Sequence, residues 1–189
     1  MRSDSLAHAW FLKAASQRWR DAEYKVAYNY AKGRGVGRNA QQAFYWTSRC
    51  ADQGDPECMF NMVNCYLNGS GTVKNTDSML AWATRLALIT DPGHQRFSGL
   101  ITSSRANLAN LYLDGKILKR DAEKGYMWFL IYNENKADFS IADQQLNIDD
   151  IRHLETQLSP VQRKQAVTDA ATLLGKPLKN LDRLYATDL

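Results

Sequence analysis

Tryptophan, tyrosine and glycine recur in this chain at fixed intervals. Each kind is spaced first by 36 residues and then by 46, at Trp46, Trp82 and Trp128, at Tyr30, Tyr66 and Tyr112, and at Gly33, Gly69 and Gly115. A shift of ten residues shared by all three kinds indicates an insertion, which we place in LITDPGHQRFSGLITSS. Periodicity of this length is the signature of a repeat architecture and limits the possible folds more than any single motif does.

Each repeat is predicted to contain two helices. The first helix is expected in DAEYKVAYNYAKG, DPECMFNMVNCYLNG or SRANLANLYLDG, each of which ends at a glycine. The second is expected in NAQQAFYWTSRCA, NTDSMLAWATRLA or DAEKGYMWFLIYN, and begins after a capping residue, Asn39, Asn75 or Asp121. A lone helical hairpin cannot bury both of its apolar faces, whereas stacked neighbours can. The sequence therefore predicts an all-α solenoid.

The segment AKGRGVGRN has the glycines and basic residues of a phosphate-binding loop, but its context is different. A phosphate loop follows a strand and opens a helix, whereas a helix is expected to precede this segment. Gly33 and Gly35 also have counterparts one repeat later, in NGSGTVKN. We therefore interpret the segment as a joint between the two helices of a repeat, in which glycine allows a positive φ.

Beyond residue 133 the repeat fades, and capping helices are expected. Ile151, Leu154 and Leu158 lie on one face of a first helix. Ser159 and Pro160 are suited to begin a second helix, which is expected to end at Gly175. Such helices would shield the apolar face of the last repeat, as the end of a solenoid requires.

The repeat units resemble the Sel-1-like repeat family, which is related to the tetratricopeptide repeats. The resemblance rests on AEYKVAYNYAKGRGV…QQAFYWTSRCA, CMFNMVNCYLNGSGTV…SMLAWATRLA and ANLANLYLDGKIL…EKGYMWFLIYN, and it covers about residues 6–133. The third unit departs from the family pattern because it lacks the second glycine of Gly-x-Gly, so its loop is expected to take another turn. The resemblance implies a right-handed α-solenoid in which the four tryptophans, Trp10 included, belong to the packing pattern.

The expected organisation follows from these matches. Residues 1–133 carry the repeats: a half repeat at 6–17, repeats at about 20–52, 54–88 and 104–133, and the insertion at about 88–104. Residues 134–189 form the C-terminal helical cap. The half repeat has two explanations, trimming of a longer exported precursor or an atypical cap, and trimming is the one we favour.

Cys50 and Cys58 are the sharpest local signal. They are separated by seven residues that include a Gly54-Asp55-Pro56 turn. Stacking of the two helices would bring their Cα atoms within the roughly 4.4–6.8 Å that a disulfide needs; the alternative is two buried free thiols in a cytosolic protein. The same spacing occurs in secreted, cysteine-rich Sel-1-like proteins, so the resemblance implies a disulfide and an oxidising compartment such as the periplasm. Cys65 is expected to be reduced.

Motifs for catalysis, metal binding or cofactor binding are not apparent. The three histidines lack the i, i+4 spacing of a metal-ligand pair, and Asp149 and Asp150 are interpreted as acids in the first turn of a helix. We expect no cofactor and no metal. Apolar runs fall short of the roughly 18 residues of a membrane span, and scattered basic residues argue against a nucleic-acid partner.

A protein partner is the better prediction. Tetratricopeptide-like solenoids bind partners on a concave surface, which here would be formed by the first helices on the side opposite the core. The candidate residues recur in register: Tyr24, Lys25, Tyr28 and Lys32; Phe60, Asn61, Asn64 and Asn68; and Asn107, Asn110 and Asp114. The asparagine amides would hold the backbone of an extended segment, the aromatic rings would add contact area, and the lysines would favour an acidic partner. The alternative is ordinary surface polarity with partly buried aromatic rings.

These expectations lead to a functional hypothesis. The chain is predicted to be a non-catalytic, exported or periplasmic protein, monomeric apart from its partner, that binds another protein. Among the roles that the resemblance implies, the most specific is an immunity protein that neutralises a secreted antibacterial effector such as a phospholipase. The alternatives are a secreted enzyme of peptidoglycan or β-lactam chemistry and a cytosolic adaptor scaffold.

Overall fold

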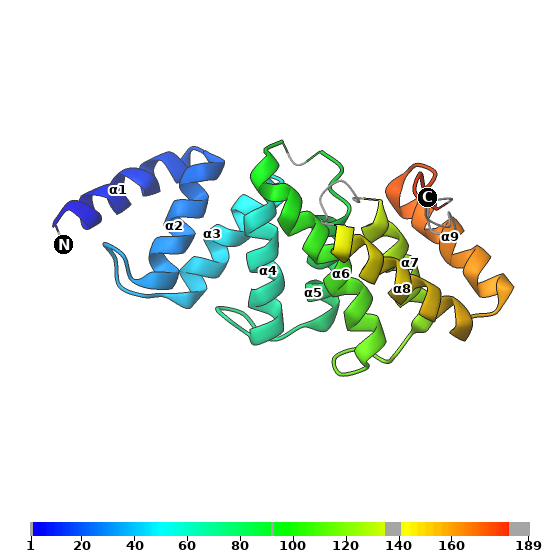
Figure 1. Cartoon of the computed structure of the whole chain (residues 1–189). Helices are drawn as coiled ribbons and strands as arrows, with labels where there is room; N and C mark the ends of the chain where they lie inside the picture. The colour runs from blue at the N-terminus through cyan, green and yellow to red at the C-terminus, as the bar shows by residue number, and fades with distance from the viewer. Residues whose placement is uncertain (1, 92, 135–140, 182–189) are drawn as a thin grey trace. The chain divides into compact units, whose positions relative to one another are not determined.

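The computed structural model describes residues 2–91, 93–134 and 141–181. Within these ranges the chain is helical and has no strand, which confirms the predicted all-α class (Figure 1). The repeat region contains α1 (Arg2–Ser16), α2 (Arg20–Lys32), α3 (Ala40–Asp52), α4 (Pro56–Asn68), α5 (Thr76–Ala87), α6 (Ser98–Asp114) and α7 (Ala122–Asn133). A 3-10 helix, η1 (Gln95–Phe97), precedes α6, while α8 (Ile141–Gln157) and α9 (Pro160–Leu174) follow α7.

Contacts divide the chain into two compact units, residues 1–86 and 87–189. In the first unit, α1, α2 and α3 each pack against the next helix along the chain. In the second unit, α7 packs against α6, α8 and α9. Packing between successive helices is the arrangement expected of stacked helical repeats.

The expected helix ends are present. Asn39, Asn75 and Asp121 each accept a hydrogen bond from the backbone N–H three residues later, at 2.9, 2.8 and 3.0 Å. These side chains satisfy N–H groups that the first turn of a helix leaves without partners. At their other ends, α2, α4 and α6 are followed by glycines in the left-handed conformation. The boundaries of the repeat helices are thus set by local chemistry.

The second glycine of each Gly-x-Gly loop brings the loop onto the preceding second helix. Gly35 and Gly71 have φ of 71° and 76°. A Cβ added to Gly35 would overlap the carbonyl of Asp4 on α1, and one added to Gly71 would overlap the carbonyl of Ala40 on α3. AKGRGVGRN is therefore a joint of the repeat. In the third repeat, Ile117 stands at the position of the second glycine. Ile117 does not have positive φ, since Arg18 is the only non-glycine among the described residues that does, so this loop takes another turn as expected.

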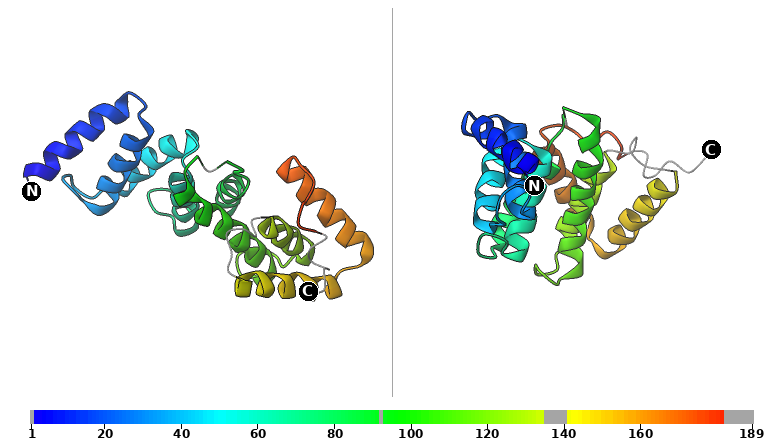
Figure 2. Two further views of the ribbon diagram at one scale, coloured as in Figure 1. Left: turned by 45° about the horizontal axis from the view of Figure 1, so that its top comes forward. Right: turned by 90° about the vertical axis from the view of Figure 1, so that its left-hand side faces the viewer.

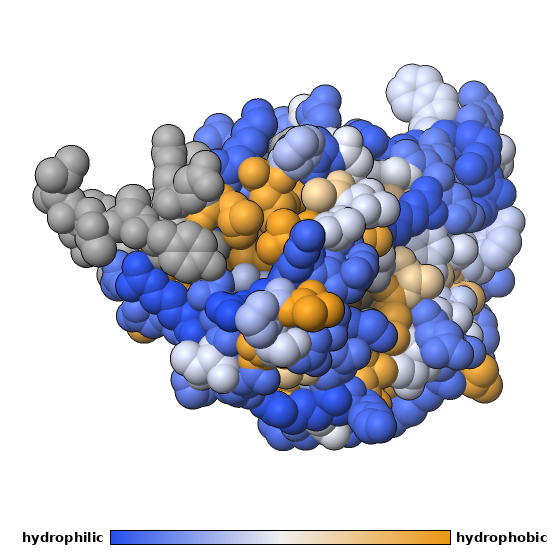
Figure 3. All heavy atoms as spheres, turned by 90° about the vertical axis from the view of Figure 1, so that its right-hand side faces the viewer, coloured by the Kyte–Doolittle hydropathy of each residue, from blue (hydrophilic) through white to orange (hydrophobic). Residues whose placement is uncertain are grey.

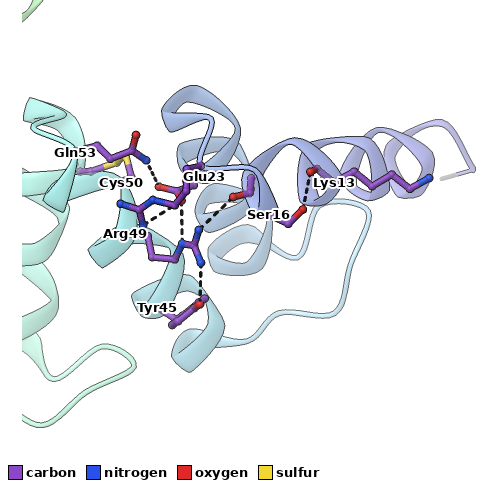
Figure 4. Close-up of polar contacts among 10 residues, drawn as sticks. Lys13, Ser16, Glu23, Tyr45, Arg49, Cys50 and Gln53 are labelled. Atoms are coloured by element: carbon purple, nitrogen blue, oxygen red, sulfur yellow. Dashed lines mark hydrogen bonds and ion pairs between the residues drawn. A yellow bond between two sulfur atoms is a disulfide. The ribbon is translucent and has the colours of Figure 1, made fainter.

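A buried carboxylate joins the first three helices (Figure 4). Glu23 on α2 is fully buried and accepts hydrogen bonds from Arg49 Nε at 2.9 Å and Gln53 Nε2 at 2.6 Å. Arg49 Nη2 also donates to the Ala15 carbonyl in the last turn of α1, at 3.4 Å. Removing one partner of a buried ion pair leaves an uncompensated charge and typically costs about 3–5 kcal/mol. The Glu23 cluster therefore fixes α3 against both α2 and α1.

An aromatic contact repeats with the same period. His8 on α1 meets Tyr30 on α2 edge to face, with ring centroids 5.1 Å apart, and it shares a 3.3 Å hydrogen bond with the Asn29 amide. One repeat later, Phe44 and Tyr66 form the equivalent edge-to-face pair at 5.6 Å. His8 thus occupies a packing position, and burial lowers the pKa of its imidazole below the ordinary value of 6.5.

The tryptophans do not share one environment. Trp46 and Trp128 are buried, with exposed fractions of 7% and 3%, and Trp82 is half-buried. Trp10 is 63% exposed, so the expectation that all four belong to the core is wrong for this residue. Trp46 packs in the cluster formed by Ala22, Val26 and Ala27 of its own repeat's first helix. No described helix provides this cover for Trp10, whose ring contacts Lys13 instead.

In the second unit, the inserted residues lengthen a helix. α6 begins at Ser98, six residues before the expected start at 104, and Phe97 and Ile101 are buried. Arg105 is also buried and donates to the carbonyls of Ala87 at 2.8 Å and Ile131 at 3.4 Å, near the ends of α5 and α7. Much of the insertion is thereby built into the packed structure of this unit.

The C-terminal helices pack through the predicted face. Ile151 and Leu154 on α8, and Leu158 directly after it, are buried. α9 follows a capping box formed by Ser159 and Gln162, and Figure 2 shows that α9 (orange) turns steeply away from the end of α8 (yellow). Because α8 begins at Ile141, Asp149 and Asp150 lie in mid-helix, and the interpretation of both as first-turn acids is wrong.

The chain after α9 returns to the end of α7. The Glu134 carboxylate accepts two hydrogen bonds of 2.9 Å. The Lys179 backbone N–H donates to Oε2, and the Asn180 backbone N–H donates to Oε1. The Asn180 side chain in turn donates to the Asn133 carbonyl at 3.0 Å. The expected cap segment 134–189 extends into residues 135–140 and 182–189, which lie outside the described residues.

The joint allows a comparison of two glycines in one loop. Gly35→Ala is expected to lower the free energy of unfolding by roughly 2–4 kcal/mol, because it adds strain at positive φ to a clash with backbone. Gly37→Ala has open space around its Cβ and should change stability by less than about 1 kcal/mol. Urea unfolding measures both values, and equal losses in the two variants would contradict the close approach.

Stability should also fall in mild acid through His8. The unfolded state binds the proton more readily than the folded state, so His8 stabilises the fold fully above its unfolded pKa. This contribution is lost as pH falls below about 6.5 toward the lower folded pKa. In His8→Phe, position 8 carries the residue found one repeat later, at Phe44. We expect the drop in Tm between about pH 7.5 and pH 5.5 to be smaller in this variant than in the original chain. An identical drop in both would count against this assignment.

Candidate functional site

A groove of about 470 Å³ lies in the first unit, bounded by α2, α3 and α4. We call it the α2–α4 groove. One wall is a stripe of α2, with Tyr24, Tyr28 and Lys32 at intervals of four residues on one helical face. The opposite wall belongs to α4 and carries Asn61 and Asn64. The sequence-predicted residues of both helices thus face the same space.

The floor of the groove is made mainly by α3 and by small side chains. It includes Ala27, Ala31, Ala40, Ala43, Phe44 and Thr47. At one end, the loop Gly69–Gly71 lies close to Ala40 and Phe44, because Gly71 has no Cβ to keep them apart. Phe44 is held by its edge-to-face contact with Tyr66. The floor is therefore built from the packing of the repeat itself.

Five predicted site residues line this groove, and three others of the first unit do not. Lys25 is exposed on α2, with its ammonium 5.6 Å from the centre of the Tyr24 ring. Phe60 and Asn68 are exposed on α4 outside the groove. Asn64, which lines the groove, donates from Nδ2 to the Phe60 carbonyl at 3.1 Å.

The remaining predicted residues lie on α6 in the second unit. Asn107, Asn110 and Asp114 are exposed. Asp114 accepts a hydrogen bond from the Lys116 N–H at 3.0 Å and forms an ion pair with its ammonium at 3.9 Å. Asp114 therefore helps to form the turn after α6.

Sequence reasoning missed the contributions of α3 and of the loop before it. Arg38, Phe44 and Thr47 line the groove, although only first helices were expected to do so. Cys65 also lines it, and burial raises the pKa of its thiol. The repeat period contained the signal for Phe44, because His8 and Phe44 are one repeat apart and each precedes by 22 residues a tyrosine of the next helix.

Cys50 and Cys58 form a disulfide, and their Cα atoms are 5.8 Å apart. The bond joins the last turn of α3 to the first turn of α4, so it links the floor of the groove to one of its walls. Cys65 is free. Asp55 caps α4 by accepting a hydrogen bond from the Cys58 N–H at 2.9 Å, and it lies 3.7 Å from Arg20 Nε.

The same corner holds the one group of three potential metal-ligating atoms found among the described residues. The sulfurs of Cys50 and Cys58 and a carboxylate oxygen of Asp55 lie within 4.8 Å of one another. Metal ligation needs thiolates, whereas both sulfurs are consumed in the disulfide. With the disulfide formed, these residues connect α3 to α4 and provide no thiolate for a metal.

A second, more apolar groove of about 600 Å³ lies in the second unit, along α9 and the segment that follows it. It is lined by Val167, Ala171, Pro177, Leu178 and Leu181 among others. Figure 3 shows apolar residues gathered among polar ones on this side of the molecule. Two further apolar residues of α9, Val161 and Leu173, are exposed.

Comparison with known proteins identifies the repeats. A family model described as Sel1 repeat matches residues 1–18, 20–55, 56–87 and 102–131. None of the curated proteins compared with the chain is similar to it in sequence. In the part of the chain that the structure describes, no helix combines the length and apolar character needed to cross a membrane.

The solved structures that are similar to this chain include two crystal structures. A Sel1 repeat protein from Oxalobacter formigenes is 23% identical, with a TM-score of 0.57 over 89% of this chain and 45% of its own. The protective antigen c5321 of uropathogenic Escherichia coli, which displays an SLR fold, is 20% identical, with a TM-score of 0.43 over 97% of this chain and 44% of its own. The chain thus spans less than half the length of either protein.

Loss of the disulfide should destabilise the first unit. Cys50→Ala/Cys58→Ala is expected to lower the free energy of unfolding by roughly 2–3 kcal/mol, since a closed loop with a sequence separation of 8 restricts the unfolded chain. Cys65→Ala serves as the control and should cost less than about 1 kcal/mol, because its thiol is outside the bond and only partly buried. In the unreduced, denatured chain one cysteine should react with an alkylating reagent; reaction of all three would contradict the bond.

Proposed function

Because the chain belongs to the Sel1 repeat family, we propose that it is a non-catalytic binding protein whose α2–α4 groove holds a segment of a partner protein. Sel1 repeat proteins are generally scaffolds for protein–protein interaction. The family assignment gives the class of function, and the geometry of the first unit suggests where binding occurs.

The observation that carries the proposal is the chemistry of the groove. Tyr28 is 42% exposed, although it belongs to a helix that packs on both of its neighbours. Tyrosine supplies a large contact area with little loss of side-chain entropy, and for this reason it is enriched in interfaces. Asn61 and Asn64 face it with amides that can both donate to and accept from a peptide backbone. Rings on one wall and amides on the other suit an inserted segment of chain.

We further propose that the protein is exported and that its partner is a secreted antibacterial effector, such as a phospholipase, which it neutralises as an immunity protein. The disulfide supports export, because such bonds form and persist in oxidising compartments. Neutralisation requires only that the groove retain a segment which the effector needs for activity. This role needs no catalytic group on the binding protein.

Site-specific photo-crosslinking tests the proposal. A benzophenone amino acid is placed at Tyr28, which lines the groove, or at Tyr45, which is 49% exposed on α3 and outside the groove. In the native host, we expect a partner to be crosslinked from position 28 and not from position 45, because only position 28 would face the bound segment. The crosslinked protein is then identified by mass spectrometry.

The immunity role has its own measurement. Expression of the captured partner should be toxic, and the original chain should relieve this toxicity while Tyr28→Ala should relieve it less. Tyr45→Ala is the matched control and should protect like the original chain. Equal crosslinking from both positions would refute the groove as the binding site, and a non-toxic partner would refute the immunity role alone.

A further inference from the structure

We infer that the segment bound in the α2–α4 groove is an extended acidic one, with two apolar side chains followed by a carboxylate at alternate positions. This inference rests on the proposed function and specifies the chemistry of the partner. It is drawn from the charge of the groove, from the order of side chains along α2 and from the spacing between them.

The charge of the groove has one sign. Lys32 and Arg38 line it, and no aspartate or glutamate is among its lining residues, all of which the structure describes. The sequence of the first unit carries 11 Lys/Arg and 7 Asp/Glu, a net charge of +4, while the second unit carries 13 of each. The net charge of the whole chain therefore resides in the unit that contains the groove. Complementary charge favours an acidic partner and steers its approach.

The cations lie at one end of the groove. Along the α2 stripe, Tyr24 and Tyr28 come first and Lys32 follows in the last turn, while Arg38 lies in the loop beyond α2. An apolar side chain of the partner would contact the rings, and its carboxylate would meet the two cations. The groove therefore has a direction, from aromatic to basic.

The spacing along α2 suits an extended chain. Residues four apart in a helix are separated by about 6 Å along its axis. Alternate residues of an extended chain are separated by about 6.6 Å and point to the same side. A segment running along α2 would thus place successive alternate side chains opposite Tyr24, Tyr28 and Lys32, while its backbone could pair with the amides of Asn61 and Asn64.

Synthetic peptides test this inference directly. The matched probe is fluorescein-Gly-Leu-Ser-Leu-Ser-Asp-Asp-Gly-amide. Its controls replace both aspartates by asparagine or by lysine, or keep the composition and move the aspartates between the leucines. Fluorescence anisotropy with the full chain gives Kd at about 50 mM and about 300 mM salt. We expect the matched probe to bind at least roughly fivefold more tightly than each control, and this advantage to shrink at high salt.

Charge variants of the protein locate the effect. Lys32→Gln/Arg38→Gln should weaken the matched probe roughly five- to tenfold and leave the asparagine probe unchanged. Lys74→Gln/Lys119→Gln removes the same charge from exposed residues outside the groove and should change Kd by less than about twofold. All of these side chains are exposed, so the variants are expected to fold.

The other outcomes separate this inference from the proposed function. If Tyr28→Ala weakens all probes alike while the charge variants have no effect, the groove binds segments and the acidic specificity is wrong. If both pairs of lysine or arginine substitutions weaken binding equally, the attraction is general and the inference is overturned. Absence of binding by the matched probe at about 1 mM also overturns it, whereas the proposed function stands or falls with the crosslinking from position 28.

Discussion

The contact on which much of the first unit depends is one between two stretches of backbone. Gly35 and Gly71 allow their loops to touch the first turns of α1 and α3 without an intervening side chain. This contact sets the distance between a repeat and the one before it. It also closes one end of the α2–α4 groove, because Gly71 lies against Ala40 and Phe44, which form part of the floor. The geometry of the α2–α4 groove thus follows from the geometry of the repeat joint.

The repeats differ in chemistry at equivalent positions. Glu23, Met59 and Arg105 occupy the same repeat position and are all buried. Glu23 pairs with Arg49, whereas Arg105 donates to the carbonyls near the ends of α5 and α7. Because a buried charge is tolerated only with its partners, Glu23 and Arg105 each depend on the groups that surround them in their own repeat position. Period alone does not make the repeats interchangeable.

Most of the fold could be predicted from the sequence because it is set by local signals. The capping residues Asn39 and Asp121, the terminal glycines and the apolar face of α8 each act within one helix or one turn. The exposure of Trp10 could not be predicted in this way, because it depends on whether another helix covers the ring. The early start of α6 was missed for a related reason: Phe97 and Ile101 lie in the insertion, where the repeat period does not predict that they are buried.

The candidate site could be predicted only in part. The spacing of Tyr24, Tyr28 and Lys32 places them on one side of α2, and the repeat period places Asn64 at the position of Tyr28 one repeat later. The period does not account for Asn61, which lines the groove although its counterpart Lys25 does not. The contribution of α3 was missed because the first helices alone were expected to form the surface. Arg38, in the loop before α3, and Thr47, on α3, line the groove from outside the first helices.

Cys65 occupies the position that Asn29 holds one repeat earlier, and this exchange has a practical consequence. Cys50 and Cys58 are joined in the disulfide and do not line the groove. Among the described cysteines, Cys65 is the one with a free thiol, and it lines the groove. Since burial raises its pKa, labelling of this thiol will be slow at neutral pH and faster in alkaline buffer. The rate of labelling would report on whether the groove is occupied, because a bound segment would cover the thiol, and no engineered residue is needed.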